Sequence, residues 1–145
     1  MTQAIQDSLR NAPLFAGVSA ATLEAIARAT REEKFDEGDR VYEFGDDAEA
    51  IYLVAAGRVR FSLGVGNRAG TDSVMGPGQV FGWAALIDEN PRRVATAVCL
   101  EPCAIRVIPA RALLDIFDRD RASGYLVMRR LAGLIARDFM SVLAV

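Results

Sequence analysis

The stretch GPGQVFGWAALI, residues 76–87, departs from the pattern of the sequence on either side of it. Gly occupies three of its first seven positions, which frees the backbone for dihedral angles that other residues rarely adopt. The next residues, WAAL at 83–86, favour a short helix, and a helix that starts after a glycine turn presents backbone N–H groups to anions such as phosphate. Downstream, Arg92 and Arg93 supply two guanidinium groups that suit phosphate. The segment therefore indicates either a phosphate-binding turn or a loop with a solvated arginine pair.

The residues around this stretch, from 33 to 108, form short apolar-rich runs separated by Gly, Asp, Asn and Pro. Such runs predict β-strands, and Ala56-Gly57 between two of them predicts a tight hairpin turn. The expected strands cover residues 40–43, 50–55, 58–65, 71–75, 94–100 and 104–108. Many short strands at fairly even spacing favour a barrel or sandwich over a parallel α/β sheet.

Helical patterns flank the predicted strands. Ser19 can cap a helix over about residues 20–31, preceded by a short helical or irregular lead-in around Pro13. Pro109 suits the first turn of a helix over about 110–117, and a longer helix is expected over about 121–143. The expected apolar stripe of that long helix is Tyr125, Met128, Leu131, Ala132, Ile135, Phe139 and Val142. We therefore expect one domain over residues 1–145, with an N-terminal helical part (1–32), a β part (33–108) and C-terminal helices (109–145).

The composition excludes several kinds of catalytic site. The chain has 145 residues, a formal net charge of −2, a hydrophobic fraction of 52%, two Cys and no His. Without His, the Ser-His-Asp and Cys-His nucleophile systems and all His-ligated metal or haem sites are ruled out. The sequence is accordingly expected to be neither an enzyme nor the host of a metal or other cofactor.

The chain also lacks signs of export or of membrane insertion. Its start, MTQAIQDSLRNA, has no basic end and no apolar run, and its longest uncharged stretch, residues 73–87, is too short to span a bilayer. We therefore expect a cytoplasmic protein in which Cys99 and Cys103 are free buried thiols. The mild net charge argues against a large nucleic-acid footprint.

The order of elements and the 76–87 segment resemble the cyclic-nucleotide-binding domain family, the sensor module of catabolite-activator-type regulators, kinase regulatory subunits and some ion channels. The resemblance covers nearly the whole chain. Its carriers are Pro13-Leu14-Phe15 with Leu23, Glu37-Gly38-Asp39, Phe44-Gly45-Asp46, Ile51-Tyr52-Leu53-Val54 with Gly57, Pro77-Gly78, Phe81-Gly82 and Arg93-Val94-Ala95-Thr96-Ala97. It implies a mainly β fold, a double-stranded β-helix or jelly-roll-like β-roll with an N-terminal helix and two C-terminal helices.

The resemblance also implies a phosphate-binding cassette, which this sequence keeps only in part. In the family the cassette reads Phe-Gly-Glu, a short helix, and an Arg followed by a small or hydroxyl residue; the Glu accepts a hydrogen bond from the ribose 2′-hydroxyl and the Arg pairs with the cyclic phosphate. Here Phe81-Gly82 is intact, Trp83 replaces the Glu, Arg93 fits the Arg by its Arg-x-Ala-Thr context, and Val94 replaces the hydroxyl residue. Arg92 would fit the shorter spacing of kinase-type members.

These matches predict a ligand site and leave several roles open for Trp83. Gly82 and the backbone amides of Trp83, Ala84 and Ala85 would face a phosphate that Arg93, or else Arg92, neutralises. An indole only donates a hydrogen bond, so it cannot replace a carboxylate as an acceptor for the ribose. Trp83 would instead pack in the core, line the pocket or stack on a base. The expected ligand is a small anion, with cyclic AMP and cyclic GMP as the candidates.

The family resemblance suggests how such a domain would act. Its long helix, here residues 121–143, often pairs in a dimer, so a homodimer and an effector protein of unknown identity are the expected partners. The chain shows no helix-turn-helix after this helix, so direct DNA binding is not expected. The alternative is a degenerate module that binds no ligand and serves dimerisation or docking. A metal-dependent enzyme on a similar β-roll, as in cupins, is disfavoured because no His is present.

Overall fold

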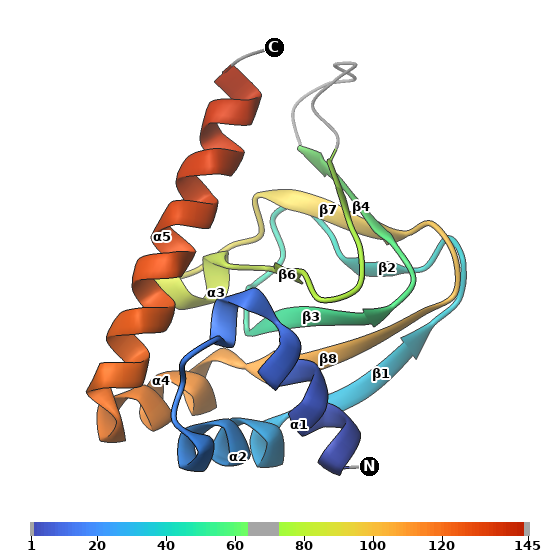
Figure 1. Ribbon diagram of the computed structural model, residues 1–145. Helices are drawn as coiled ribbons and strands as arrows, with labels where there is room; N and C mark the ends of the chain where they lie inside the picture. The colour runs from blue at the N-terminus through green and yellow to red at the C-terminus, as the bar shows by residue number, and fades with distance from the viewer. Residues whose placement is uncertain (1, 64–72, 144–145) are drawn as a thin grey trace.

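Two antiparallel four-stranded sheets form the body of the molecule in the computed structural model, which describes residues 2–63 and 73–143 (Figure 1). In the first sheet the order is β1 (Arg31–Phe35), β8 (Cys103–Pro109), β3 (Ala50–Ala56), β6 (Val80–Phe81). In the second it is β2 (Arg40–Tyr42), β7 (Ala95–Cys99), β4 (Val59–Leu63), β5 (Ser73–Met75). This arrangement confirms the predicted jelly-roll-like β-roll.

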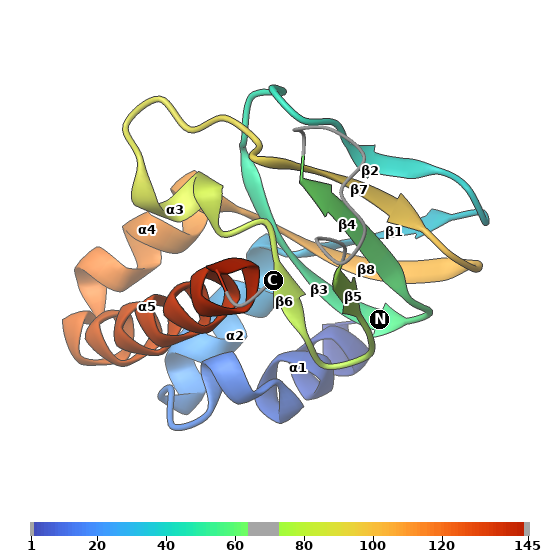
Figure 2. The same cartoon turned by 90° about the horizontal axis from the view of Figure 1, so that it is seen from above.

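The helices gather on one side of the two sheets (Figure 2). They are α1 (Thr2–Asn11), the 3-10 turn η1 (Pro13–Phe15), α2 (Ala20–Ala29), α3 (Ala84–Ile87), α4 (Ala110–Arg119) and α5 (Arg121–Leu143). The helix N-terminal to the roll and the two C-terminal helices are therefore present as predicted. The side chain of Ser19 accepts a hydrogen bond from the backbone N–H of Thr22, which confirms the predicted cap.

Several local predictions differ from the structure. The hairpin predicted at Ala56-Gly57 was wrong, because β3 and β4 on either side of this turn belong to different sheets. The helix expected to reach residue 31 ends at Ala29, because Thr30 has extended dihedral angles and Arg31 already pairs with Val107 in β1. Strand β6 was not predicted, since its two residues lie inside the Gly-rich stretch. Strand β1 was not predicted either. The lead-in contains a full helix, α1. The predicted strand ends at residues 64–65 and 71–72 lie outside the described residues.

Strand β3 separates two hydrophobic clusters. Because successive side chains of a strand point to opposite faces, Ile51 and Leu53 contact the cluster formed with the helices, whereas Ala50, Tyr52 and Val54 face the cluster inside the roll. The interior of the roll is thus lined by every second residue of β3. The side chains that could contact a ligand there are fixed by strand pairing.

The buried face of α5 differs from the predicted stripe. Val127 and Leu131 are buried, but Tyr125 is 66% exposed and Ala132 is also exposed, so these two residues of the stripe do not pack on the rest of the chain. The reason is the close contact of α5 with α4 at Gly124, where an added Cβ would lie 2.7 Å from Cβ of Phe117. Val127 and Leu131 continue this face at the helical spacing of three and four. Phe139 and Val142 of the predicted stripe have side chains outside the described part of the structure.

A carboxylate at the junction of α4 and α5 ties the N-terminal and C-terminal helices together. Asp120 accepts hydrogen bonds from the hydroxyls of Ser19 (2.9 Å), Thr22 (2.7 Å) and Ser123 (2.6 Å), and from the backbone N–H of Ser123 (3.2 Å). The hydrogen bonds from Ser123, then those from Thr22 and Ser19, lower the pKa of Asp120 well below its ordinary value. The charged form is therefore favoured by folding.

Replacing this carboxylate by Asp120→Asn is expected to lower the melting temperature at pH 7 by several degrees. Since the folded pKa is depressed, the stabilisation is present above the ordinary pKa of about 4 and is lost as the pH falls below it. The difference in melting temperature between wild type and variant, measured by thermal unfolding, should therefore narrow from pH 5 to pH 3. Asp118→Asn, an exposed position in the same helix end, is the control and should change little. A difference in melting temperature that stays constant with pH would contradict the role given to Asp120.

Candidate functional site

The Gly-rich stretch folds as a turn, a two-residue strand and a short helix. The backbone N–H of Gly78 donates to the carbonyl of Val54, and β6 then pairs with β3 through Tyr52–Phe81 and Leu53–Val80. Helix α3 follows at Ala84–Ile87, which confirms the short helix predicted after the glycine turn. The stretch therefore packs along the edge of the first sheet.

Gly82 makes the change of direction between β6 and α3. Its φ is +84°, a conformation that residues with a side chain rarely adopt. A Cβ at this position would lie 2.9 Å from Cδ2 of Tyr52, 3.0 Å from a guanidinium nitrogen of Arg93 and 3.3 Å from the carbonyl oxygen of Ala50. Glycine is thus required both by the backbone and by the close approach of Arg93.

Arg93 lies inside the roll and is only 3% exposed. One terminal nitrogen donates to the carbonyl of Gly82 at 3.0 Å; the other donates to the carbonyl of Ala50 at 2.7 Å and, at 3.5 Å, to the hydroxyl of Tyr52. Its Nε has no hydrogen-bond partner among the residues that the structure describes. None of these partners is a carboxylate, so the described residues bind the guanidinium without neutralising its charge.

Aromatic rings enclose the Arg93 guanidinium. Its carbon lies 4.2 Å from the ring centre of Tyr42 and 5.3 Å from that of Tyr52, both within the range of cation–π contacts. The Tyr52 ring stacks on Phe81 at 5.0 Å, and Phe61 meets Phe81 edge-on at 4.9 Å. Burial raises the pKa of both tyrosine hydroxyls, so they stay neutral.

Sequence reasoning missed these two tyrosines as parts of the site. Tyr42 and Tyr52 each sit in a predicted strand, where an aromatic residue is ordinary. The period-two alternation of β3 places Tyr52 on the inner face, but no sequence feature indicates that Tyr42 or Tyr52 contacts Arg93. The pairing of β2 with β7, which brings Tyr42 opposite Ala97, supplies that information.

The residues on either side of Arg93, Arg92 and Val94, face outward. Arg92 is exposed, forms an ion pair with Asp47 at 3.3 Å and donates to the carbonyl of Gly45 at 3.2 Å. Val94 is 48% exposed. Because consecutive side chains of an extended chain point to opposite sides, only Arg93 of the two arginines enters the roll.

The remaining residues of the stretch lie against the helices. Ala84 and Ala85 are buried, and the half-buried indole of Trp83 packs on the cluster that the helices form with β3. The N–H of Ala85 donates to the carbonyl of Gly82 at 3.4 Å, and that of Leu86 to the carbonyl of Trp83 at 3.0 Å. Trp83 therefore has the core-packing contacts that were one of its three expected roles.

The two cysteines lie apart from these contacts of Arg93. Cys99 and Cys103 are free and buried, as predicted, and burial followed by the contact with Cys103 raises the pKa of Cys99 to about 12. Within residues 2–63 and 73–143, no group of three His, Cys, Asp or Glu side chains is close enough to hold a metal ion. No helix in the same ranges combines the length and apolar character needed to cross a membrane.

Comparisons of the sequence with known proteins agree on one protein family. Residues 32–120 match the sequence model of the family described as "Cyclic nucleotide-binding domain". The chain is 31% identical to the cyclic AMP receptor protein of Thermus thermophilus over 137 residues, 94% of this chain and 57% of that protein. It is 31% identical to a cAMP-dependent protein kinase regulatory subunit of Yarrowia lipolytica over 106 residues, 70% of this chain and 27% of the relative. The chain thus spans about half the length of the first relative, and less of the second.

Solved structures show the same fold. The Thermus thermophilus catabolite activator protein superposes with a TM-score of 0.71 at 28% identity, covering 90% of this chain and 59% of that one. The sensor domain of the transcriptional regulator DNR from Pseudomonas aeruginosa gives 0.76 at 22% identity, covering 99% and 95%. The regulatory domain of Toxoplasma gondii PKA, crystallised with cAMP, gives 0.77 at 21%, covering 94% and 50%. With its family match over residues 32–120, which include the whole 76–94 region, this chain belongs to the cyclic nucleotide-binding domain family.

Proposed function

We propose that residues 1–145 act as one regulatory sensor domain that binds a small anionic ligand of the cyclic nucleotide class. The role is binding and not catalysis. In this proposal Arg93 pairs with the phosphate, beside Phe81, Gly82 and the backbone amides at the start of α3. The observation that carries it is the guanidinium of Arg93, buried inside the roll with its Nε unpaired by any described residue.

The electrostatics of Arg93 support an anionic ligand. Burying a charge is costly unless an opposite charge and hydrogen bonds compensate for it. Here carbonyl groups and aromatic rings supply only partial compensation. A phosphate group would supply the missing negative charge and an acceptor for Nε, in the bidentate geometry that arginine favours.

The relatives support the ligand class. One relative is called a cyclic AMP receptor protein, and two from Mycobacterium tuberculosis strains are called CRP-like cAMP-activated global transcriptional regulators. These names describe proteins that are longer than this chain. They make a cyclic nucleotide the first ligand to test.

Trp83 implies a weakened sugar contact. Its indole packs on the helical cluster and offers no acceptor to a ribose hydroxyl. Losing a charged hydrogen-bond partner typically costs about 1.5–3 kcal/mol, or roughly ten- to a hundredfold in affinity. We therefore infer weaker nucleotide binding than a cassette with Glu would give.

A second candidate function is a module that binds no ligand and works through dimerisation or docking. It is favoured by the contacts of Arg93 within the chain. Its terminal nitrogens already donate to the carbonyls of Gly82 and Ala50, and its guanidinium carbon lies over the Tyr42 ring. Tyr125 on the exposed side of α5 is 66% accessible and would be available to a second copy or to an effector. In either case α5 would carry the output to that partner.

The two candidates are separated by titrating cyclic AMP and cyclic GMP into the wild-type chain. Trp83 is the single tryptophan and lies next to Gly82, so its fluorescence reports on this site, while calorimetry gives the stoichiometry. We expect saturable one-to-one binding of at least one cyclic nucleotide and much weaker binding of 5′-AMP. If neither cyclic nucleotide binds at millimolar concentration, the nucleotide proposal is wrong. Sedimentation equilibrium then tests self-association through α5.

A further inference from the structure

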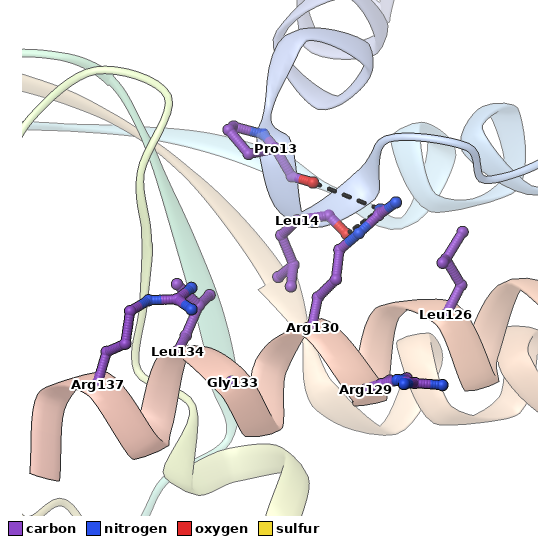
Figure 3. A pocket seen from close by; sticks show the side chains of 8 residues that line it. All are labelled: Pro13, Leu14, Leu126, Arg129, Arg130, Gly133, Leu134 and Arg137. Carbon is purple, nitrogen blue, oxygen red and sulfur yellow. Dashed lines mark hydrogen bonds between the residues drawn. The ribbon is translucent and has the colours of Figure 1, made fainter. Parts of the chain in front are cut away.

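A groove of about 450 Å³ lies between η1 and α5, on a different part of the molecule from Arg93 (Figure 3). Its apolar surface comes from side chains of both elements, among them Leu14 and Leu126. Its polar surface comes from three arginines of α5: Arg129, Arg130 and Arg137. The groove thus combines apolar walls with a concentration of positive charge.

The charge of the three arginines is not balanced locally. Among the side chains that the structure describes, none of the three forms an ion pair with a carboxylate. Arg130 donates to the carbonyls of Pro13 (3.4 Å), Leu14 (3.3 Å) and Ala16. Arg129 donates to the hydroxyl of Tyr125 at 3.1 Å. These neutral partners hold the guanidinium groups in place and leave their charge available to an anion.

Gly133 shapes the middle of the groove. The position of a Cβ on Gly133 would be 3.6 Å from a guanidinium nitrogen of Arg137, so Arg137 lies back along its own helix over the glycine. Arg130 and Arg137 are separated by two helical turns, about 11 Å along the axis. Between them Leu134 and Leu14 provide an apolar surface, as Figure 3 shows.

We propose that this groove binds an organic anion: a molecule with a phosphate or carboxylate group and an apolar body. The anionic group would pair with the arginines, whose planar fork suits both phosphate and carboxylate, and the body would cover the leucines. The volume falls in the range of small-molecule sites, about 300–1,000 Å³. Because the groove is built from η1 and α5, an occupant would hold these two elements together. The proposal does not depend on cyclic nucleotide binding.

The first test titrates 1-naphthyl phosphate and 1-naphthoate into the full chain by calorimetry, with thermal unfolding as a second readout. We expect one-to-one binding and a rise in melting temperature with at least one of the two anions, since a ligand specific for the folded state stabilises it. The two arms distinguish phosphate from carboxylate as the anionic group. Neutral 1-naphthol and inorganic phosphate, which each lack half of the chemistry, should bind at least tenfold more weakly. Equal binding of 1-naphthol would overturn the proposal.

Two variants then locate the site. The double variant Arg129→Gln with Arg137→Gln removes charge while leaving Arg130 bonded to η1, and it should weaken binding at least tenfold. Gly133→Leu keeps all three charges and fills the groove; it should also abolish binding, and it places a better helix former within α5. Arg111→Gln, on the exposed side of α4, is the matched charge control and should bind as the wild type does.

The outcomes separate this site from the roll. If 1-naphthyl phosphate binding survives both groove variants but is lost with Arg93→Met, the anion enters the roll and the groove proposal is wrong. If cyclic nucleotide fails to bind anywhere while the naphthyl anion binds and responds to the groove variants, the groove proposal stands and the nucleotide proposal falls. If the groove variants lose 1-naphthyl phosphate binding while Arg93→Met binds it as the wild type does, the groove is a second, independent anion site.

Discussion

Replacing Arg93 with methionine is expected to abolish cyclic nucleotide binding and to lower the free energy of unfolding by about 2–5 kcal/mol. Methionine keeps much of the length of the side chain but donates no hydrogen bond. The carbonyl of Ala50 would lose the donor that Arg93 supplies at 2.7 Å, and the carbonyl of Gly82, which Arg93 bonds at 3.0 Å, would keep only the N–H of Ala85 at 3.4 Å. A phosphate in the roll would lose its positive partner at the same time.

The adjacent residue supplies a matched control. Arg92→Met removes the same charge from the sequence, but Arg92 is exposed and its ion pair with Asp47 is a surface pair, typically worth about 0–1 kcal/mol. Urea unfolding should therefore separate the two variants clearly, and calorimetry with cyclic AMP and cyclic GMP should find binding only in Arg92→Met.

A third variant covers the case in which Arg93→Met does not fold. Arg93→Lys keeps the charge and can reach one of the two carbonyls, so it should fold better while its nucleotide affinity drops, because lysine cannot make the two-pronged contact with phosphate. Nucleotide binding lost in Arg92→Met and kept in Arg93→Met would assign the phosphate to Arg92 instead.

The fold was predictable from sequence because its signals are local. Short strand patterns and the Ser19 cap each depend on a few neighbouring residues, and the structure contains both. The chain also turns at Ala56-Gly57, where Gly57 has a φ of +91°, but the turn joins strands of different sheets and is not the predicted hairpin. The ends of elements were less predictable. Residue 31 extends the helical pattern, yet pairing with β8 assigns it to a strand. Long-range pairing overrode local preference there.

The candidate site was predictable only in part. The Phe81-Gly82 pair and Arg93 stand out in the sequence by their spacing, but the environment of Arg93 does not. The aromatic contacts of Arg93 come from Tyr42 and Tyr52, 51 and 41 positions away in the chain, and depend on strand register. Likewise, the predicted apolar stripe of α5 does not show which of its residues pack on the same chain: Tyr125 is exposed, because Gly124 rather than a large side chain sets the face of α5 against α4.

Introducing glutamate by Trp83→Glu is expected to strengthen cyclic nucleotide binding by roughly ten- to a hundredfold, the equivalent of about 1.5–3 kcal/mol for a hydrogen bond to a charged group. The carboxylate would accept the hydrogen bond from the ribose 2′-hydroxyl that the indole cannot accept. The indole's packing on the helical cluster is lost in the same change, so the variant should also be less stable by about 1–3 kcal/mol. Calorimetry measures the affinity, since the fluorescent residue is gone.

Trp83→Gln isolates the carboxylate from the packing loss. Glutamine has nearly the same shape as glutamate and removes the same indole, so the ratio of the two affinities reports on the charge alone. Repeating both titrations with 2′-deoxy cyclic AMP tests the assigned partner: the advantage of Glu over Gln should disappear when the hydroxyl is absent. Equal affinities of the two variants for cyclic AMP would contradict this prediction and would mean that the side chain at position 83 faces only the helices. In that case the departure from Phe-Gly-Glu alters packing and not the sugar contact, and Arg93 is left as the residue that decides whether an anion binds in the roll.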